Sequence, residues 1–198
     1  MIGSMAFFAV EDLFLKSVAE VMPPGQVLAM TGAVGALVFW ALAARRGEAV
    51  LDRRALRGVP LLRSLSEAGA AMLYIVALAL APLSMTAALL QASPLVVVAG
   101  AALVLRERVG WRRWTSILTG FIGVLVILSP WDAEFDPVGL LTVACVLVLA
   151  ARDLSTRVMP RDIGTFPVSA WAYAGLVPAG VLLMAVMGQA PVWPTALQ

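Results

Sequence analysis

Residues 61–128 read LLRSLSEAGAAMLYIVALALAPLSMTAALLQASPLVVVAGAALVLRERVGWRRWTSILTGFIGVLVIL. They contain three apolar runs, at about 62–80, 84–105 and 114–128, which are separated by a proline and by an arginine-rich loop. A helix needs ~20 residues to cross the ~30 Å hydrocarbon core of a bilayer, and these runs approach or reach that length. A soluble domain buries one core and does not need a series of such runs. We therefore expect this stretch to form three membrane-spanning helices.

Four further apolar runs lie outside this stretch, at about 2–22, 27–44, 137–156 and 166–187. Hydrophobic residues make up 62% of the chain and charged residues 13%, whereas soluble domains are usually about half apolar and about a quarter charged. The expected fold is therefore all-α, a polytopic transmembrane helix bundle of about seven helices. Charged residues interrupt the first run, so we interpret it as a retained helix and not as a cleaved signal peptide.

The arginines predict how the helices are oriented. They lie in the loops beside the second, fourth and sixth runs: Arg45, Arg46, Arg53, Arg54, Arg57, Arg63, Arg106, Arg108, Arg112, Arg113, Arg152, Arg157 and Arg161. The opposite loops carry none, and one of them contains Asp132, Glu134 and Asp136. Because cytoplasmic loops are enriched in arginine and lysine, we expect a multi-pass protein of the inner (plasma) membrane with a cytoplasmic N-terminus.

The residue types argue against enzyme chemistry. Histidine is absent, which removes catalytic triads, cysteine–histidine dyads and nearly all zinc sites. The single cysteine, Cys145, lies in an apolar run and is expected to be a small buried hydrophobe. The sequence has no nucleotide-binding glycine motif, and its arginines lie in short loops between membrane helices. We expect no enzyme activity, no catalytic residue, no metal, no cofactor and no nucleic-acid partner.

An internal repeat relates the first and sixth runs. Residues 12–16 (DLFLK) and 153–157 (DLSTR) both fit the pattern D-L-x-x-[KR], and Val-Met-Pro follows shortly after each. Five helices separate the two copies, and an odd number inverts the second copy relative to the first in the membrane. Inverted repeats are common among secondary transporters.

The third to fifth runs resemble the drug/metabolite transporter superfamily, EamA type. The motif residues are a mid-helix Pro94, Leu-x-Glu-Arg at 105–108, a tryptophan at Trp111 or Trp114, and Gly120-x-x-Gly123. The resemblance covers essentially the whole chain, and it implies a ten-helix fold of two inverted five-helix halves. Residues 1–129 would form the first EamA repeat, and residues 137–198 the start of a second, inverted and incomplete one.

The resemblance implies a secondary transporter. We expect an exporter of a small organic metabolite, such as an amino acid or a related solute, that works by alternating access. The expected partners are this solute and the lipid bilayer, and a homodimer is left open. The alternative is a non-transporting scaffold or assembly subunit, or a partial chain that requires a partner. A membrane-embedded enzyme is a weaker third option, because the sequence has no nucleophile–base or metal constellation.

Ionisable side chains in the first run are the first candidates for a solute path, since each costs ~2.5–3.5 kcal/mol at the centre of a membrane helix. Asp12 and Lys16 are four residues apart and can pair on one helix face, which would be a structural role. Glu11 has no such partner. It is therefore our preferred candidate for a proton-coupling carboxylate.

Glu67 and Tyr74 lie seven residues apart in the third run and so share a helix face. Arg63 precedes Glu67 by four residues and can neutralise it at the cytoplasmic interface, which favours a structural role for this carboxylate. Tyr74 lies deeper, where its hydroxyl needs a partner on another helix or on a solute. Glu107, between two arginines, is expected to hold its loop electrostatically.

Pro94 predicts a kink in the fourth run. It cannot form the helical hydrogen bond to the carbonyl of Leu90, and a carbonyl freed in this way can bind solute while the kink serves as a hinge. Gln91 and Ser93 add polar groups at the same depth. Proline is also common in membrane helices without such a role.

Trp171 and Tyr173 in the last run can line the same cavity, although aromatic packing or an interfacial belt is the favoured interpretation. Gly32 and Ala36 have the small-x-x-x-small spacing that lets two helix backbones approach closely. We interpret that pair as a packing surface and not as a site.

Overall fold

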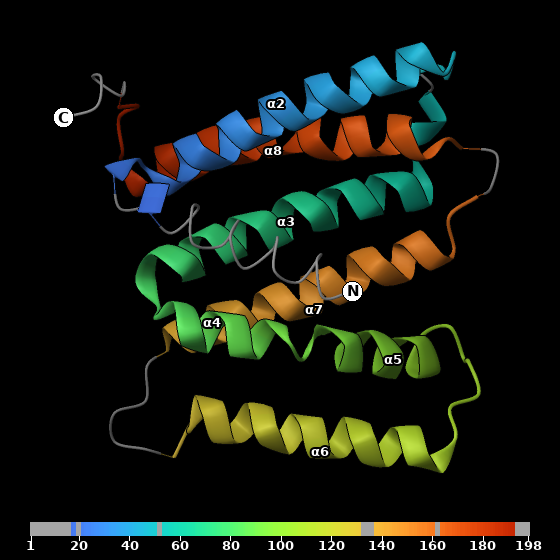
Figure 1. The fold of residues 1–198 in the computed structure, drawn as a ribbon, viewed down its shortest axis with the longest axis vertical. Helices are drawn as coiled ribbons and strands as arrows, with labels where there is room; N and C mark the ends of the chain where they lie inside the picture. Colours follow the sequence, from blue (N-terminus) through green and yellow to red (C-terminus); the bar gives the residue numbers. More distant parts are fainter. Residues whose placement is uncertain (1–16, 19–20, 51–52, 132–136, 161–162, 193–198) are drawn as a thin grey trace.

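The computed structural model describes residues 17–18, 21–50, 53–131, 137–160 and 163–192 (Figure 1). Its elements are α2 (Pro24–Arg45), the 3-10 helix η1 (Arg53–Leu56), α3 (Gly58–Leu80), α4 (Leu83–Leu90), α5 (Ser93–Leu103), α6 (Trp111–Leu128), α7 (Val138–Arg157) and α8 (Thr165–Met187). Among the described residues, six segments are long and apolar enough to cross a membrane, with α4 and α5 together forming one of them. The expected all-α polytopic bundle is confirmed. Glu11, Asp12 and Lys16 lie outside the described residues.

The helices lie side by side in the order α2, α8, α3, α7, α4–α5 and α6 (Figure 1). Neighbours in this order are often distant in sequence, since α2 packs most extensively against α8, and α3 against α7. The last two helices of the described chain are therefore inserted between the earlier ones.

All the arginine-bearing ends of the helices lie at one side of the bundle, on the right in Figure 1. They are the end of α2, the start of α3, the end of α5, the start of α6 and the end of α7, and the start of α8 lies on the same side. We call this the arginine side and the other end the opposite side. The separation of loops predicted from the arginines is thus present in the fold.

Several helices begin earlier than the sequence predicts. α2 begins at Pro24, where 27 was expected, and α3 begins at Gly58, where 62 was expected. Prolines fall in the first turn of both helices, where the missing N–H has no helical partner in any case. α6 begins at Trp111 and not at 114, so two arginines belong to its first turn.

The fourth span is broken, and the prediction of one helix over 84–105 is wrong in this respect. α4 ends at Leu90 and α5 begins at Ser93, with a turn at Gln91 and Ala92 between them. The N–H of Leu95 donates to the carbonyl of Ala92 at 3.0 Å, which starts the new helix. Pro94 lacks an N–H to continue the old one, so the expected kink is present as a complete interruption.

α2 and α8 touch along their backbones. A Cβ atom added at Gly25 would collide with the carbonyl oxygen of Gly180, and one added at Gly180 would collide with that of Gly25. Gly32 packs equally closely on Leu176 and on the carbonyl of Tyr173. The packing role predicted for Gly32 is confirmed, and small residues let these membrane helices approach.

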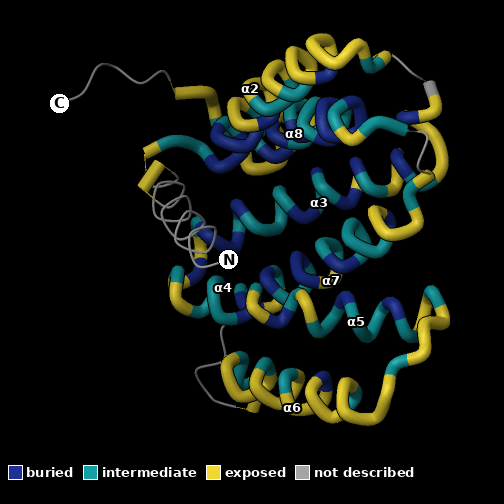
Figure 2. The backbone as a smooth tube through the Cα atoms, turned by 45° about the vertical axis from the view of Figure 1, so that its right-hand side comes forward, coloured by how far each residue is buried: buried dark blue, intermediate teal, exposed yellow. Residues whose placement is uncertain are grey.

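Two clusters of the core lie where α2, α3 and α8 meet. They centre on Val27, Ile75 and Leu183, and on Leu28, Ala68 and Leu176. By contrast, α6 lies at the edge of the bundle and is exposed along most of its length (Figure 2). A helix that is apolar and exposed in this way suits contact with lipid.

Candidate functional site

A cluster of four charged side chains joins α3 to α7 on the arginine side. Nη1 of Arg152 donates to both carboxylate oxygens of Glu67, at 3.2 and 3.4 Å. Nη2 of Arg63 lies 3.8 Å from the same carboxylate. The predicted Arg63–Glu67 pair is present, but the closer partner is Arg152. That partner lies 85 positions away and was identified from the sequence only as a flanking arginine.

Arg152 holds a second carboxylate as well. Its Nε and Nη2 atoms lie 2.9 and 2.7 Å from Oδ1 of Asp153. With Arg63 and Glu67 the cluster contains two cations and two anions, and all four side chains are partly covered. Charges near a membrane are tolerated when they are paired in this way. The cluster fixes the arginine ends of α3 and α7 together.

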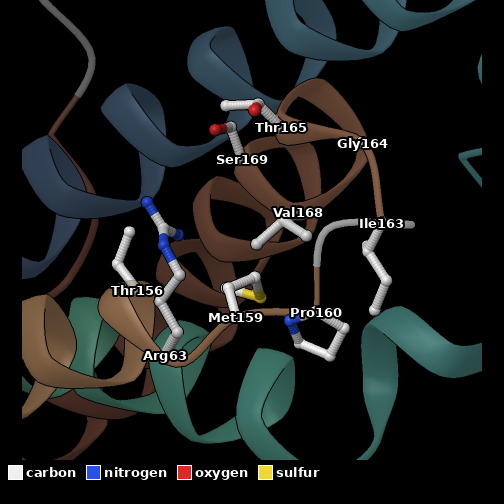
Figure 3. A pocket seen from close by; sticks show the side chains of 9 residues that line it. All are labelled: Arg63, Thr156, Met159, Pro160, Ile163, Gly164, Thr165, Val168 and Ser169. Atoms are coloured by element: carbon white, nitrogen blue, oxygen red, sulfur yellow. The ribbon is translucent and has the colours of Figure 1, made fainter.

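A cavity of about 300 Å³ lies beside this cluster, between the start of α3, the end of α7 and the start of α8 (Figure 3). Arg63 supplies the charge in its lining, and its polar neighbours are the hydroxyls of Thr156, Thr165 and Ser169. In Figure 3 the guanidinium of Arg63 extends towards the α8 hydroxyls. Nη1 of Arg63 is buried and has no hydrogen-bond partner among the described residues. This arrangement can accept an oxygen-rich group of a small molecule.

The remaining predicted residues of α3 to α5 lie away from this cavity. Tyr74 is half-buried about two turns further along α3 than Glu67. Gln91 and Pro94 are exposed, and Ser93 is half-buried, at the break between α4 and α5. Their predicted place on a solute path remains a prediction.

Trp171 and Tyr173 face α2. Nε1 of Trp171 donates to the carbonyl of Val50 at 2.7 Å and so ties the loop after α2 to α8. Trp171 also lines an apolar cavity of about 100 Å³. The ring of Tyr173 stacks on Phe39, with the ring centres 5.3 Å apart, and fills the space above Gly35. These contacts support the packing interpretation that the sequence favoured.

The second copy of the repeat motif does not pair internally. Asp153 binds Arg152, whereas Arg157 binds Glu107 of the α5–α6 loop at 3.3 Å. The electrostatic role predicted for Glu107 is therefore confirmed, with a partner that the sequence did not suggest. The pairing of Asp12 with Lys16 stays a prediction, because both lie outside the described residues.

The site has no visible metal or catalytic constellation within the described ranges. No group of three or more His, Cys, Asp or Glu side chains lies close enough there to hold a metal ion. The thiol of Cys145 is fully buried and donates to the carbonyl of Ala70 at 3.3 Å. Its expected role as a buried hydrophobe agrees with this position.

Comparison with known proteins gives relatives that are all named as transporters. A riboflavin transporter of Vibrio cholerae is 44% identical over 70 residues, which are 35% of this chain and 24% of the relative. A riboflavin transporter of Rhizobium johnstonii is 32% identical over 53% of this chain and 35% of its own. A pseudopaline exporter of Pseudomonas aeruginosa is 30% identical over 76% of this chain and 54% of its own.

The chain spans between about a quarter and about half of the length of these relatives. No solved structure matches it. The model of the EamA-like transporter family matches residues 1–129, which is well over half of the sequence. With the all-helical fold and the six apolar spans, this match identifies the chain as a multi-pass membrane protein that belongs to the EamA-like transporter family.

Proposed function

We propose that this chain is a secondary transporter, and specifically an exporter of a small organic metabolite such as an amino acid or a related solute. The observation that carries the proposal is the cavity beside Arg63, in a family whose named members move small molecules. If the arginine side faces the cytoplasm of an inner (plasma) membrane, as the arginine loops suggest, this cavity is where a cytoplasmic solute would enter. An exporter needs such an entrance.

An inverted repeat would provide alternating access. The D-L-x-x-[KR] motifs begin at 12 and 153, and α2 and α8 begin at 24 and 165, so both pairs are separated by 141 positions. With this register Gly32 corresponds to Tyr173, and these two residues touch each other. Contact between equivalent residues is expected where two inverted helices cross on a twofold axis. This supports residues 1–129 and 137–198 as two repeats of the ten-helix fold that the family resemblance implies.

The contacts on either side of this crossing agree with the same axis. Gly35 packs on Tyr173, and the equivalent contact is Gly32 on Leu176, which is also present. In the register of 141 positions, Glu11 corresponds to Arg152. Glu11 remains our candidate for the coupling carboxylate, with Asp12 and Lys16 beside it in the sequence.

Transport by the purified chain in liposomes tests the proposal. The panel is riboflavin, S-adenosylmethionine and amino acids, each loaded against a proton or sodium gradient. We expect gradient-driven flux of at least one solute, and we expect Arg63→Gln to reduce it at least tenfold. Arg57→Gln is the matched control, because Arg57 precedes α3 and does not line the cavity. Glu11→Gln should abolish driven flux but leave solute exchange.

Two outcomes count against the proposal. Absence of flux for folded protein across the panel would favour the non-transporting scaffold or a chain that requires a partner. Equal flux in Arg63→Gln and Arg57→Gln would remove the cavity from the solute path, even if transport itself is found.

A further inference from the structure

The corner between α5 and α6, residues 103–113, carries an unbalanced positive charge on the arginine side. Its arginines are all exposed, and they are Arg106, Arg108, Arg112 and Arg113. Glu107 is the one acidic residue of the corner, and its carboxylate forms an ion pair with Arg157 of α7 at 3.3 Å. Among the described residues no ion pair involves any of the four arginines. Within the described part of the chain, these cations therefore have no anion that neutralises them.

Exposed apolar side chains surround these arginines. Leu103 and Val104 are 71% and 70% exposed, and Trp111 is 72% exposed. The guanidinium of Arg112 lies 5.7 Å from the centre of the Trp111 ring. A tryptophan beside cationic side chains at the end of a membrane helix is typical of the lipid headgroup region.

The start of α6 adds to the positive potential. Arg112 and Arg113 are the second and third residues of this helix, where the helix dipole disfavours cations. The first turn contains no acidic residue, and no side chain caps it. The positive charge at the start of α6 is therefore not neutralised within its first turn, and it can attract an external anion.

The exposed face of α6 continues from this corner into the membrane. Leu118 and Ile122 lie four residues apart on one face and are 59% and 61% exposed. Ile117 is the buried residue of this helix. The corner is therefore open to the bilayer along the helix and not only to water.

We propose that the α5–α6 corner binds the headgroup of an anionic phospholipid in the leaflet on the arginine side. The lipid phosphate lies against Arg108, Arg112 and Arg113, and the acyl chains lie along the exposed face of α6. The four arginines, which pair with no carboxylate among the described residues, select a negative headgroup, and the apolar rim distinguishes a lipid from a soluble anion. This inference does not depend on the transport function.

Lipid binding to the purified chain in detergent tests the site. The probes are phosphatidylglycerol and phosphatidylcholine, counted as bound molecules by native mass spectrometry. We expect phosphatidylglycerol to be preferred, and the triple variant Arg108→Gln, Arg112→Gln, Arg113→Gln to bind it roughly 100-fold more weakly, since each arginine near an anionic surface contributes a factor of about five. The control is Arg45→Gln, Arg46→Gln, Arg57→Gln, which removes the same charge from another exposed arginine loop.

A second readout holds even if the triple variant folds poorly. Brominated phosphatidylglycerol should quench the fluorescence of Trp111, measured as wild type minus Trp111→Phe, more strongly than brominated phosphatidylcholine does. If the two triple variants lost phosphatidylglycerol binding equally, the lipid would be attracted to the arginine side in general, and this would overturn the local site. Competition by inorganic phosphate at the lipid's own concentration would show a site for free anions and overturn the lipid assignment.

Discussion

The two ends of the α2–α8 pair are packed in opposite ways. On the opposite side Gly25 and Gly180 bring the two backbones into direct contact. On the arginine side Phe39 and Phe166 lie between the helices with their ring centres 6.3 Å apart, and Arg46 lies 4.6 Å above the ring of Phe166. Under the separation of 141 positions, 25 corresponds to 166 and 39 to 180. The same contact is thus made by two glycines at one end and by two phenylalanines at the other.

The backbone arrangement is therefore repeated at the two ends of the pair, whereas the side chains at the equivalent positions differ. Equivalent contacts on the two sides of the crossing fit one twofold arrangement of helices. The side chains break that symmetry, because glycine permits close approach and phenylalanine prevents it. The cavity beside Arg63 lies on the arginine side, between α3, α7 and α8.

The largest effect is expected on the opposite side, where the backbones of α2 and α8 touch. Gly180→Ala places a methyl group against the carbonyl of Gly25 and the backbone nitrogen of Ala29, atoms that cannot move aside without separating the helices. We expect a loss of about 3 kcal/mol in the free energy of unfolding, measured by denaturation in mixed micelles. Gly175→Ala, in the same helix, has no atom within 4 Å of its new Cβ and should be neutral or slightly stabilising. Equal losses in the two variants would show that the glycine contact is unimportant.

A smaller effect is expected where charges hold α3 to α7 on the arginine side. Glu67→Ala leaves Arg63 and Arg152 without their shared carboxylate, which is 22% exposed. We expect this variant to lose about 1–2 kcal/mol of stability, because the site is only partly shielded from water. Glu107→Ala breaks the pair with Arg157, whose side chains are 45% and 49% exposed, and should cost less than about 0.5 kcal/mol. A larger loss of stability in Glu107→Ala than in Glu67→Ala would mean that the α3–α7 cluster does not stabilise the arginine side.

The sequence predicts the spans well, and also that the arginine-bearing ends gather on one side of the bundle, because apolar length and arginine placement are properties of single segments. It also predicts a kink at Pro94, although not the separation into two helices, and it predicts the local Arg63–Glu67 pair; both depend on residues a few positions apart. It does not predict the contact of Glu67 with Arg152 or that of Gly25 with Gly180. Those depend on which helices become neighbours, and helix packing here joins segments 85 and 155 positions apart.

The candidate site shows the same limit. The sequence indicates Arg63 only as a partner for Glu67. Nothing in the local pattern indicates that one nitrogen of its guanidinium lies beside a cavity without a hydrogen-bond partner among the described residues. Trp171 and Tyr173 were considered for a solute path because aromatic residues suit both a cavity and an interface. Their partners, Val50 and Phe39, come from the end of α2 and the loop after it. Only the tertiary arrangement distinguishes these two roles.

An effect smaller than that of Glu67→Ala is expected at Trp171, which ties α8 to the loop after α2. Trp171→Phe keeps the ring but removes the N–H that donates to Val50 at 2.7 Å. The carbonyl of Val50 then loses a partner, which should cost about 1 kcal/mol or less of stability. Trp40→Phe is the control, because Trp40 lines the same small cavity but is 53% exposed. If Trp171→Phe instead abolished transport while stability stayed unchanged, Trp171 would belong to the solute path. The aromatic end of the α2–α8 pair would then be part of the transport machinery and not only a spacer.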